Sequence, residues 1–210
     1  MPRRMLALVA LAEFLGMTLW FSATAVTGAI AADLALDAGA AAWLTMAVQA
    51  GFVAGTLASA LASLPDLMNA RTLFAIGCVV GAVANAGVTA ASGASTAIAC
   101  RFATGVALAW VYPPGLKIAA GWTTRRRGTA LGVLVGALSI GSAFPHLLSA
   151  LAARVAWRPL VLTASALALA GAVLVRGVVR DGPHVADTSS FNPRAAFRAM
   201  SWSTVSFDTT

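Results

Sequence analysis

The sequence predicts an all-α integral membrane protein whose six transmembrane helices form one half bundle. Two observations carry this prediction. Of the 210 residues, 60% are hydrophobic and only 10% are charged, whereas an average soluble domain is roughly 45–50% apolar and 25% charged. The mean hydropathy is +0.85, and the charged residues gather in short clusters between long uncharged stretches. The composition therefore excludes a soluble globular domain.

Uncharged stretches of helical length predict the membrane spans. A bilayer core about 30 Å thick needs about 20 mainly apolar residues of helix. Six stretches satisfy this: 5–32, 39–62, 71–91, 96–121, 128–153 and 157–179. The first is too long to be a secretory signal peptide, and five similar stretches follow it. Residues 181–210 are polar and form a cytoplasmic linker or tail, whose end we expect to be a truncation.

The connections between these stretches differ in charge, and this predicts their orientation. Setting aside Arg101, which lies inside a span, one side of the membrane collects eleven basic residues and the other collects two: Arg3, Arg4, Arg71, Lys117, Arg125, Arg126, Arg127, Arg176, Arg180, Arg194 and Arg198 against Arg154 and Arg158. Positive charge favours the cytoplasmic side. We therefore expect both termini in the cytoplasm and a multi-pass protein of the plasma (inner) membrane.

The same charge distribution excludes several function classes. The net charge of +7 sits at the ends of apolar stretches and not on a basic face with stacking aromatics, so we expect no nucleic-acid partner. Cys78 and Cys100 lack metal-ligand spacing, and no ATP-binding signature occurs, so we expect no metal and no cofactor. A membrane protease would need Ser139 beside His146, but seven residues of helix separate them by about 10 Å. We expect no enzyme.

Small residues recur at helical spacing and predict close helix packing. Gly51 and Gly55 are four residues apart in the second stretch, and Gly132, Gly136 and Gly141 lie in the fifth. In lipid, close backbone approach through small residues is what holds a bundle together.

Motifs in three regions carry a resemblance. Asp66 and Arg71 match two positions of the pattern G-x-x-x-D-R-x-G-R-R between the second and third stretches, and Arg101 begins R-x-x-x-G-x-x-x-A. Residues 125–132 are similar to R-G-x-A-x-G, and the glycines that follow precede Pro145. Together these motifs resemble the amino-terminal half of a major facilitator superfamily transporter, over roughly residues 5 to 200.

That resemblance implies a function and partners. In the family, twelve spans form two halves, with the substrate site between them near the midplane. This chain would then be a secondary carrier, or a half of one, that moves a small solute by alternating access, with protons as a further partner. Its other partners would be the lipid bilayer and a second six-helix half or a second copy in a homodimer. The alternative is a six-span protein with a structural or regulatory role and no transport.

Three ionisable residues are candidates for substrate binding or proton coupling. Glu13 lies about two turns into the first stretch, and Arg101 lies inside the fourth. Ionisable groups are costly in a bilayer, so each is a functional hypothesis; satisfaction by a neighbouring helix is the competing explanation. For Arg101 we favour coupling or packing over substrate contact. His146 follows Pro145 and titrates near neutral pH, although it also suits capping of freed backbone groups.

Polar and aromatic residues supply candidates for a cavity wall, a hinge and a gate. Trp20, Gln49 and Asn85 are expected to line the cavity. The Tyr112-Pro113-Pro114 segment lacks two amide donors and predicts a hinge, with Pro145 a second break. The resemblance implies that Asp66 and Arg71 form part of a cytoplasmic gating loop. The simpler alternative is a pair of solvated loop residues without a gating role.

Overall fold

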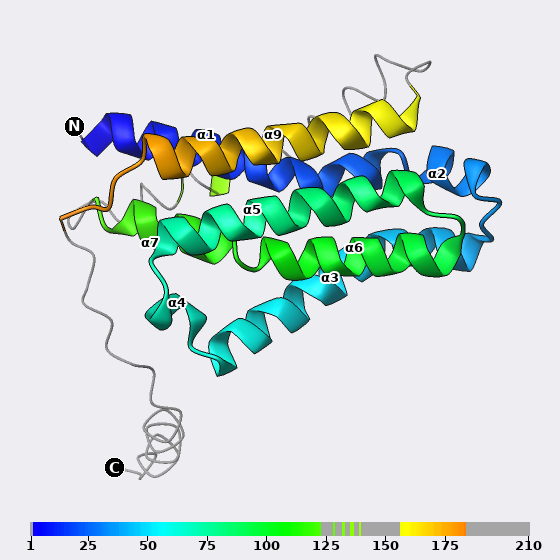
Figure 1. Ribbon diagram of the computed structural model, residues 1–210, viewed down its shortest axis with the longest axis horizontal. Helices are drawn as coiled ribbons and strands as arrows, with labels where there is room; N and C mark the ends of the chain where they lie inside the picture. Colours follow the sequence, from blue (N-terminus) through cyan, green and yellow to red (C-terminus); the bar gives the residue numbers. More distant parts are fainter. Residues whose placement is uncertain are drawn as a thin grey trace, which may run out of the picture.

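The computed structural model describes residues 2–122 and 156–183, together with positions 128, 132, 135, 136 and 139. Every regular element in these ranges is a helix (Figure 1): α1 (Pro2–Ala25), α2 (Thr27–Asp33), α3 (Ala38–Leu61), α4 (Leu64–Leu67), α5 (Ala70–Gly87), the short 3₁₀ helix η1 (Val88–Ala90), α6 (Ala94–Leu108), α7 (Tyr112–Ala120) and α9 (Trp157–Gly177). Most of the predicted stretch 128–153, with Pro145 and His146, lies outside the described residues, as does the tail from 184 onward.

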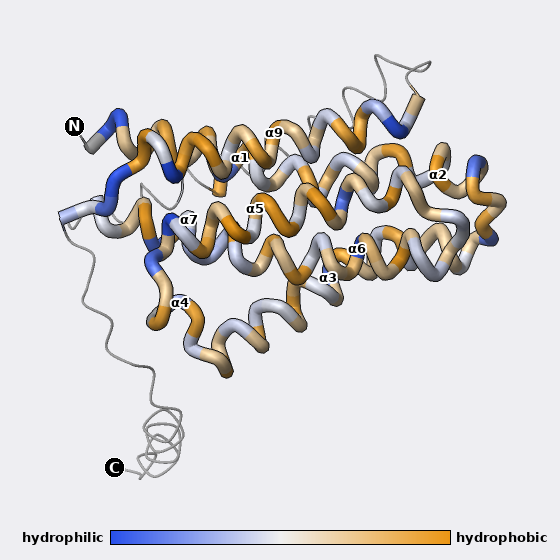
Figure 2. Tube along the Cα trace, viewed as in Figure 1, coloured by the Kyte–Doolittle hydropathy of each residue, from blue (hydrophilic) through white to orange (hydrophobic). Residues whose placement is uncertain are grey.

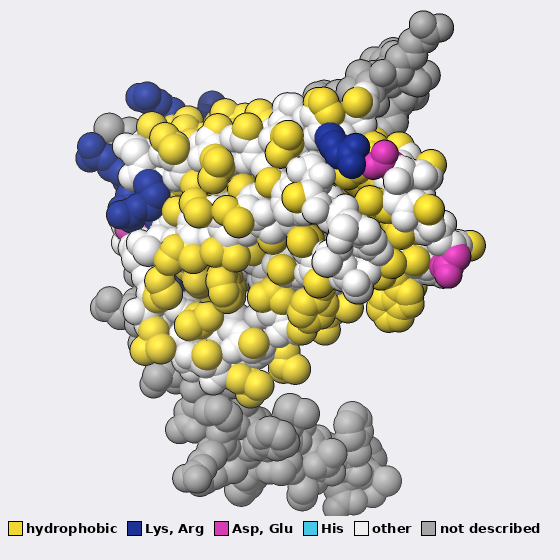
Figure 3. All heavy atoms as spheres, turned by 45° about the vertical axis from the view of Figure 1, so that its right-hand side comes forward, with side chains coloured by type: hydrophobic (Ala, Val, Ile, Leu, Met, Phe, Trp, Pro, Cys, Tyr) yellow, Lys and Arg dark blue, Asp and Glu magenta, His cyan; other side chains and the backbone are white. Residues whose placement is uncertain are grey.

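Five helical stretches of the described chain are long and apolar enough to cross a membrane. They are Arg3–Ala25, Ala38–Leu61, Ala70–Ala90, Ala94–Ala120 and Trp157–Gly177. Their outer surface carries many exposed large hydrophobic side chains, among them Val53 and Val173. Hydrophobic residues cover the middle of the molecule, while the arginines and acids gather at its two ends (Figures 2 and 3). This is the surface of a multi-pass membrane protein.

Side-chain caps and one break set where the helices begin and end. Asp37 accepts a hydrogen bond from the Ala40 amide at 2.7 Å and starts α3, and Asn69 accepts from the Arg71 amide at 2.9 Å and starts α5. Such caps satisfy amides that have no partner within the helix. The predicted stretch 5–32 is interrupted at Val26, whose backbone leaves the helical conformation. The membrane-length helix therefore ends at Ala25, and α2 continues separately.

The long helices pack in two connected groups. α1 lies beside α9, and α9 lies beside α5; α3 packs along α6, and α5 joins the two groups by also contacting α6 and α7 (Figure 1). The described helices thus form a bundle in which α5 contacts both groups. Buried polar side chains lie inside this bundle, on α1, α3, α5, α6 and α9.

Glycines allow α3 and α6 to approach backbone to backbone. A methyl group added at Gly51 would meet the Phe102 carbonyl carbon at 2.9 Å, and one added at Gly105 would meet the Phe52 amide nitrogen at 2.8 Å. At Gly55, it would meet the Val106 Cα at 2.8 Å. Real side-chain carbons do not come so close to backbone atoms, so only glycine fits at these three positions.

Candidate functional site

Arg101 fastens α6 to α1 from a fully buried position. One terminal nitrogen of its guanidinium donates to the Trp20 carbonyl at 2.9 Å and to the Thr24 hydroxyl oxygen at 3.2 Å. The other donates to the Leu19 carbonyl at 3.1 Å. The acceptors are backbone carbonyls and a hydroxyl, and the described residues place no carboxylate within ion-pair distance of Arg101. These α1 oxygens help to stabilise its positive charge.

The same guanidinium reaches α3 and α5. Its Nε donates to the Leu44 carbonyl at 3.1 Å, and a terminal nitrogen donates to Asn85 Oδ1 at 3.5 Å. Asn85 in turn donates to the Val161 carbonyl and to the Ser165 hydroxyl of α9, both at 3.1 Å. A guanidinium has five N–H groups, and these helices supply five acceptors. No donor is left for a solute, so the geometry supports a packing role for Arg101.

Glu13 is the only glutamate in the sequence, and its side chain is fully buried in α1. Among the described residues, neither carboxyl oxygen has a hydrogen-bond partner. The carboxyl group fills the space where a Cβ would stand at Gly115 of α7, with the Phe74 ring beside it. A buried carboxyl group without a partner costs stability, and such groups in membrane proteins are usually kept for function. Glu13 is therefore the strongest candidate for solute or proton coupling.

The helical stretch that contains Gly115 is interrupted a few residues before this glycine. α6 ends at Leu108 and α7 begins at Tyr112, and between them the Trp110 and Val111 amides each donate three residues back, at 3.0 Å. Proline has no amide hydrogen, so Pro113 and Pro114 cannot continue the ordinary ladder. The Gly115 amide resumes it by donating to the Val111 carbonyl at 3.0 Å. The first turn of α7, which follows the break, thus lies beside the Glu13 carboxyl.

A buried, unpartnered carboxyl beside a broken membrane helix is typical of transport proteins. The family model described as Major Facilitator Superfamily matches residues 6–209. The chain belongs to this family. No curated protein matches it significantly. Members of the superfamily move small solutes across membranes and are transporters rather than enzymes, which agrees with the apolar helices of the structure.

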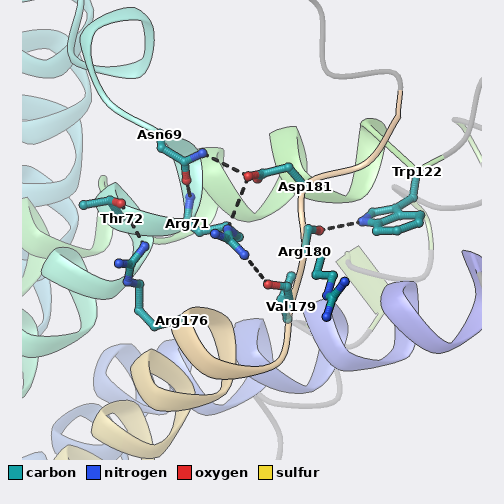
Figure 4. A network of polar contacts seen from close by, with 8 residues as sticks. All are labelled: Asn69, Arg71, Thr72, Trp122, Arg176, Val179, Arg180 and Asp181. Atoms are coloured by element: carbon teal, nitrogen blue, oxygen red, sulfur yellow. Dashed lines mark hydrogen bonds and ion pairs between the residues drawn. The ribbon is translucent and has the colours of Figure 1, made fainter.

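Arg71, which the sequence predicts to belong to a gating loop, pairs with an acid far away in the sequence. Its Nε lies 3.4 Å from an Asp181 carboxylate oxygen, and one of its terminal nitrogens donates to the Val179 carbonyl (Figure 4). The Asn69 amide donates to the same Asp181 carboxylate at 3.0 Å. The segment after α9 is thereby tied to the start of α5. Nothing is described of the Asp66 side chain.

Two further hydrogen bonds join elements at this end of the bundle. The Trp122 indole, just after α7, donates to the Arg180 carbonyl at 2.9 Å (Figure 4), and Lys117 donates to the Pro65 carbonyl of α4 at 2.7 Å. The segment 178–183 therefore crosses the ends of both α5 and α7, and α4 is joined to α7.

The other predicted residues fall in different surroundings. Trp20 is half-buried and packs edge-to-face against Phe52, with ring centroids 5.2 Å apart. Gln49 is exposed on α3. Asn85 is fully buried and forms hydrogen bonds with Arg101 and Ser165. The described residues thus place Trp20 and Asn85 around Arg101 and leave Gln49 apart from them.

Sequence reasoning missed two residues that the structure brings to these sites. Gly115 accommodates the Glu13 carboxyl, and Asp181 pairs with Arg71. A signal existed for each: Gly115 follows the double proline directly, and Asp181 is the first acid after the last span. Neither signal specifies its partner, because the contacts join positions about 100 residues apart in the chain.

Proposed function

We propose that this chain is a six-span half bundle of a secondary carrier that moves a small solute by alternating access. The stretch 128–153 supplies the span that the described residues lack, and both termini face the cytoplasm across the plasma membrane. The transport pathway forms against a second half bundle, whether from a longer chain, another protein or a second copy. Belonging to the superfamily supports transport, and the basic residues at one end of the bundle support the orientation.

Glu13 is the proton-binding group in this proposal. One observation carries it: a fully buried carboxyl without a hydrogen-bond partner in the described residues lies against Gly115, beside the break between α6 and α7. Burial makes the charged form of the carboxyl far more costly than the neutral form. Gain or loss of a proton therefore changes the energy of the contact between α1 and α7.

The hydrogen bonds in the rest of the bundle determine which helix can move when Glu13 gains or loses a proton. Arg101 ties α1, α3, α5 and α6 together through hydrogen bonds, whereas α7 is separated from α6 by the break at Ala109–Val111. We infer that α7 moves against this fixed group when Glu13 changes its protonation state.

The Arg71 and Asp181 pair serves as the gate contact at the basic end. Both side chains are partly exposed, at 22% and 38%, and exposed ion pairs stabilise a fold by only about 0–1 kcal/mol. A contact that costs so little to break suits a gate that opens in every transport cycle.

The test is a flux assay on the reconstituted protein with the Glu13→Gln variant. Proteoliposomes with an entrapped pH-sensitive dye are challenged with a panel of small carboxylates, sugars and amines. We expect at least one solute to drive proton movement with the wild type, and a loss of at least tenfold in Glu13→Gln, because an amide cannot carry a proton in this way. Asp37→Asn is the matched control: its cap survives the change, so it should transport normally.

Two outcomes would contradict the proposal. If Glu13→Gln moved protons at the wild-type rate, Glu13 would not be the group that couples transport to protons. Absence of any solute or proton flux, in wild-type protein that is correctly folded in the vesicles, would favour the structural or regulatory role.

A further inference from the structure

A shallow apolar groove lies on the outer face of α5, away from Glu13 and Arg101. Its volume is about 260 Å³, and it is lined by Thr72, Ala75, Ile76, Val79, Val80 and Arg176. The five α5 residues follow the spacing of one helix face and extend over about 12 Å of helix. Ile76, Val79 and Val80 are 37–45% exposed, so the groove opens toward the surface that faces lipid.

The groove has a basic end. Arg176, in the last turn of α9, donates to the Thr72 hydroxyl at 3.2 Å, and Figure 4 shows it beside the start of α5. Among the described residues, the Arg176 side chain makes only this hydrogen bond, and it is exposed. Most of its five N–H groups thus point to no described acceptor.

Among the described residues, positive charge exceeds negative charge around Arg176. Arg71 and Arg180 lie in the same network as Arg176, and Asp181 is the only acid drawn there (Figure 4). Because Asp181 already pairs with Arg71, the described residues give neither Arg176 nor Arg180 an acid partner at this end of the molecule. Figure 3 shows dark blue side chains gathered at this end of the yellow apolar face.

We propose that this groove is a binding site for an anionic phospholipid of the surrounding bilayer. The acyl chain lies along the apolar face of Ala75, Val79 and Val80, and the headgroup phosphate accepts hydrogen bonds from Arg176, with Arg180 adding positive charge. Guanidinium groups bind phosphate through paired N–H groups, and basic pockets between membrane helices recognise anionic headgroups. The match of an apolar groove to a chain, and of a basic end to a phosphate, selects a phospholipid over a free anion.

The lipid would also strengthen the contact between α5 and α9. Arg176 lies on α9, while the groove wall lies on α5. A ligand that touches both and does not bind the unfolded chain stabilises the bundle, and the stabilisation grows with the logarithm of the free ligand concentration above the Kd. The site should therefore be visible both as bound lipid and as a higher unfolding temperature.

The experiment titrates the purified full chain in detergent with dioleoyl phosphatidylglycerol or with dioleoyl phosphatidylcholine. Bound lipid is counted by native mass spectrometry, and thermal unfolding is followed in parallel. We expect at least tenfold tighter binding of phosphatidylglycerol, and at least a fivefold loss of that binding in Arg176→Gln. Ala75→Phe fills the groove without changing charge, and it should weaken binding as well. Arg158 is an exposed arginine at the other end of the molecule and pairs with Asp33 at 2.7 Å. The control variant Arg158→Gln should therefore bind phosphatidylglycerol as the wild type does.

Several results would overturn the proposal. Equal affinity for the two lipids would show that the headgroup charge is not recognised. Unchanged binding in Arg176→Gln would show that the lipid binds at another site. Unchanged binding in Ala75→Phe would show that the lipid does not occupy the groove. Competition by inorganic phosphate at equal concentration would show that the site binds free anions. A stable dimer that excludes lipid would show that a second copy occupies this face. Elution of each variant at the wild-type volume in size-exclusion chromatography confirms that it is folded.

Discussion

Replacing Arg101 by methionine is expected to destabilise the bundle by about 3 kcal/mol or more. The substitution removes all five hydrogen bonds from a buried guanidinium to α1, α3 and α5. Loss of two charge-assisted bonds, at the lower end of their usual worth of about 1.5–3 kcal/mol each, already reaches that value. The measurement is the thermal unfolding of the purified protein in detergent, followed by tryptophan fluorescence.

Two matched variants make this prediction specific. Arg101→Lys keeps the charge but places three donors on one atom, so it should recover only part of the stability. Arg158→Met removes an arginine whose side chain is 47% exposed and should cost less than about 1 kcal/mol. An Arg101→Met protein as stable as Arg158→Met would contradict the packing role. If it also lost solute binding, Arg101 would be a substrate ligand instead.

Replacing Gly51 or Gly105 by alanine is expected to force α3 and α6 apart and to cost about 1–3 kcal/mol each. At both positions the added methyl group would overlap backbone atoms of the facing helix, Phe102 for one and Val48 for the other, and backbone cannot turn aside as a side chain does. Since both methyl groups act at one helix contact, the double variant should cost less than the sum. Thermal unfolding in detergent measures all three proteins.

Gly28 provides the control for these glycine variants. It lies in α2, and a methyl group there would have no neighbour within 4 Å. Gly28→Ala should therefore leave the stability unchanged or raise it by up to about 1 kcal/mol, since alanine favours helix more than glycine does. If Gly51→Ala unfolds at the same temperature as Gly28→Ala, the close approach of α3 and α6 is not what holds this part of the bundle.

The helical membrane character of the chain was predictable because it depends on composition and on local runs of apolar residues. The interruption before Pro113 and Pro114 was predictable too, since proline lacks an amide hydrogen wherever it stands. The break at Val26 was not, because valine and its neighbours have no residue that forbids helix. At that break the Thr27 hydroxyl donates to the Ala23 and Thr24 carbonyls, a type of bond that often bends helices.

The partners of the polar residues were harder to predict. The motif containing Arg101 gives its position in a helix, but its acceptors on Leu19 and Leu44 are backbone carbonyls, which every residue has. Asp181 and Arg71 illustrate the same difficulty: each is visible in the sequence, while their pairing depends on how α9 lies against α5. One-dimensional patterns predict which residues are unusual, and packing decides what they touch.

The decisive measurement is a carbon-13 NMR titration of the Glu13 carboxyl group in nanodiscs. Because Glu13 is the only glutamate among the 210 residues, protein made with carboxyl-labelled glutamate gives one resonance, which Glu13→Gln removes. Amide hydrogen exchange of Tyr112–Ala120 is followed at the same pH values. We expect the resonance to move between its charged and neutral positions over the pH range in which the protection of the α7 amides, corrected for the intrinsic pH dependence of exchange, also changes. That change in protection should be absent in Glu13→Gln. A resonance that stays fixed while α7 responds to pH, or an unaltered response in the variant, would contradict proton coupling through Glu13.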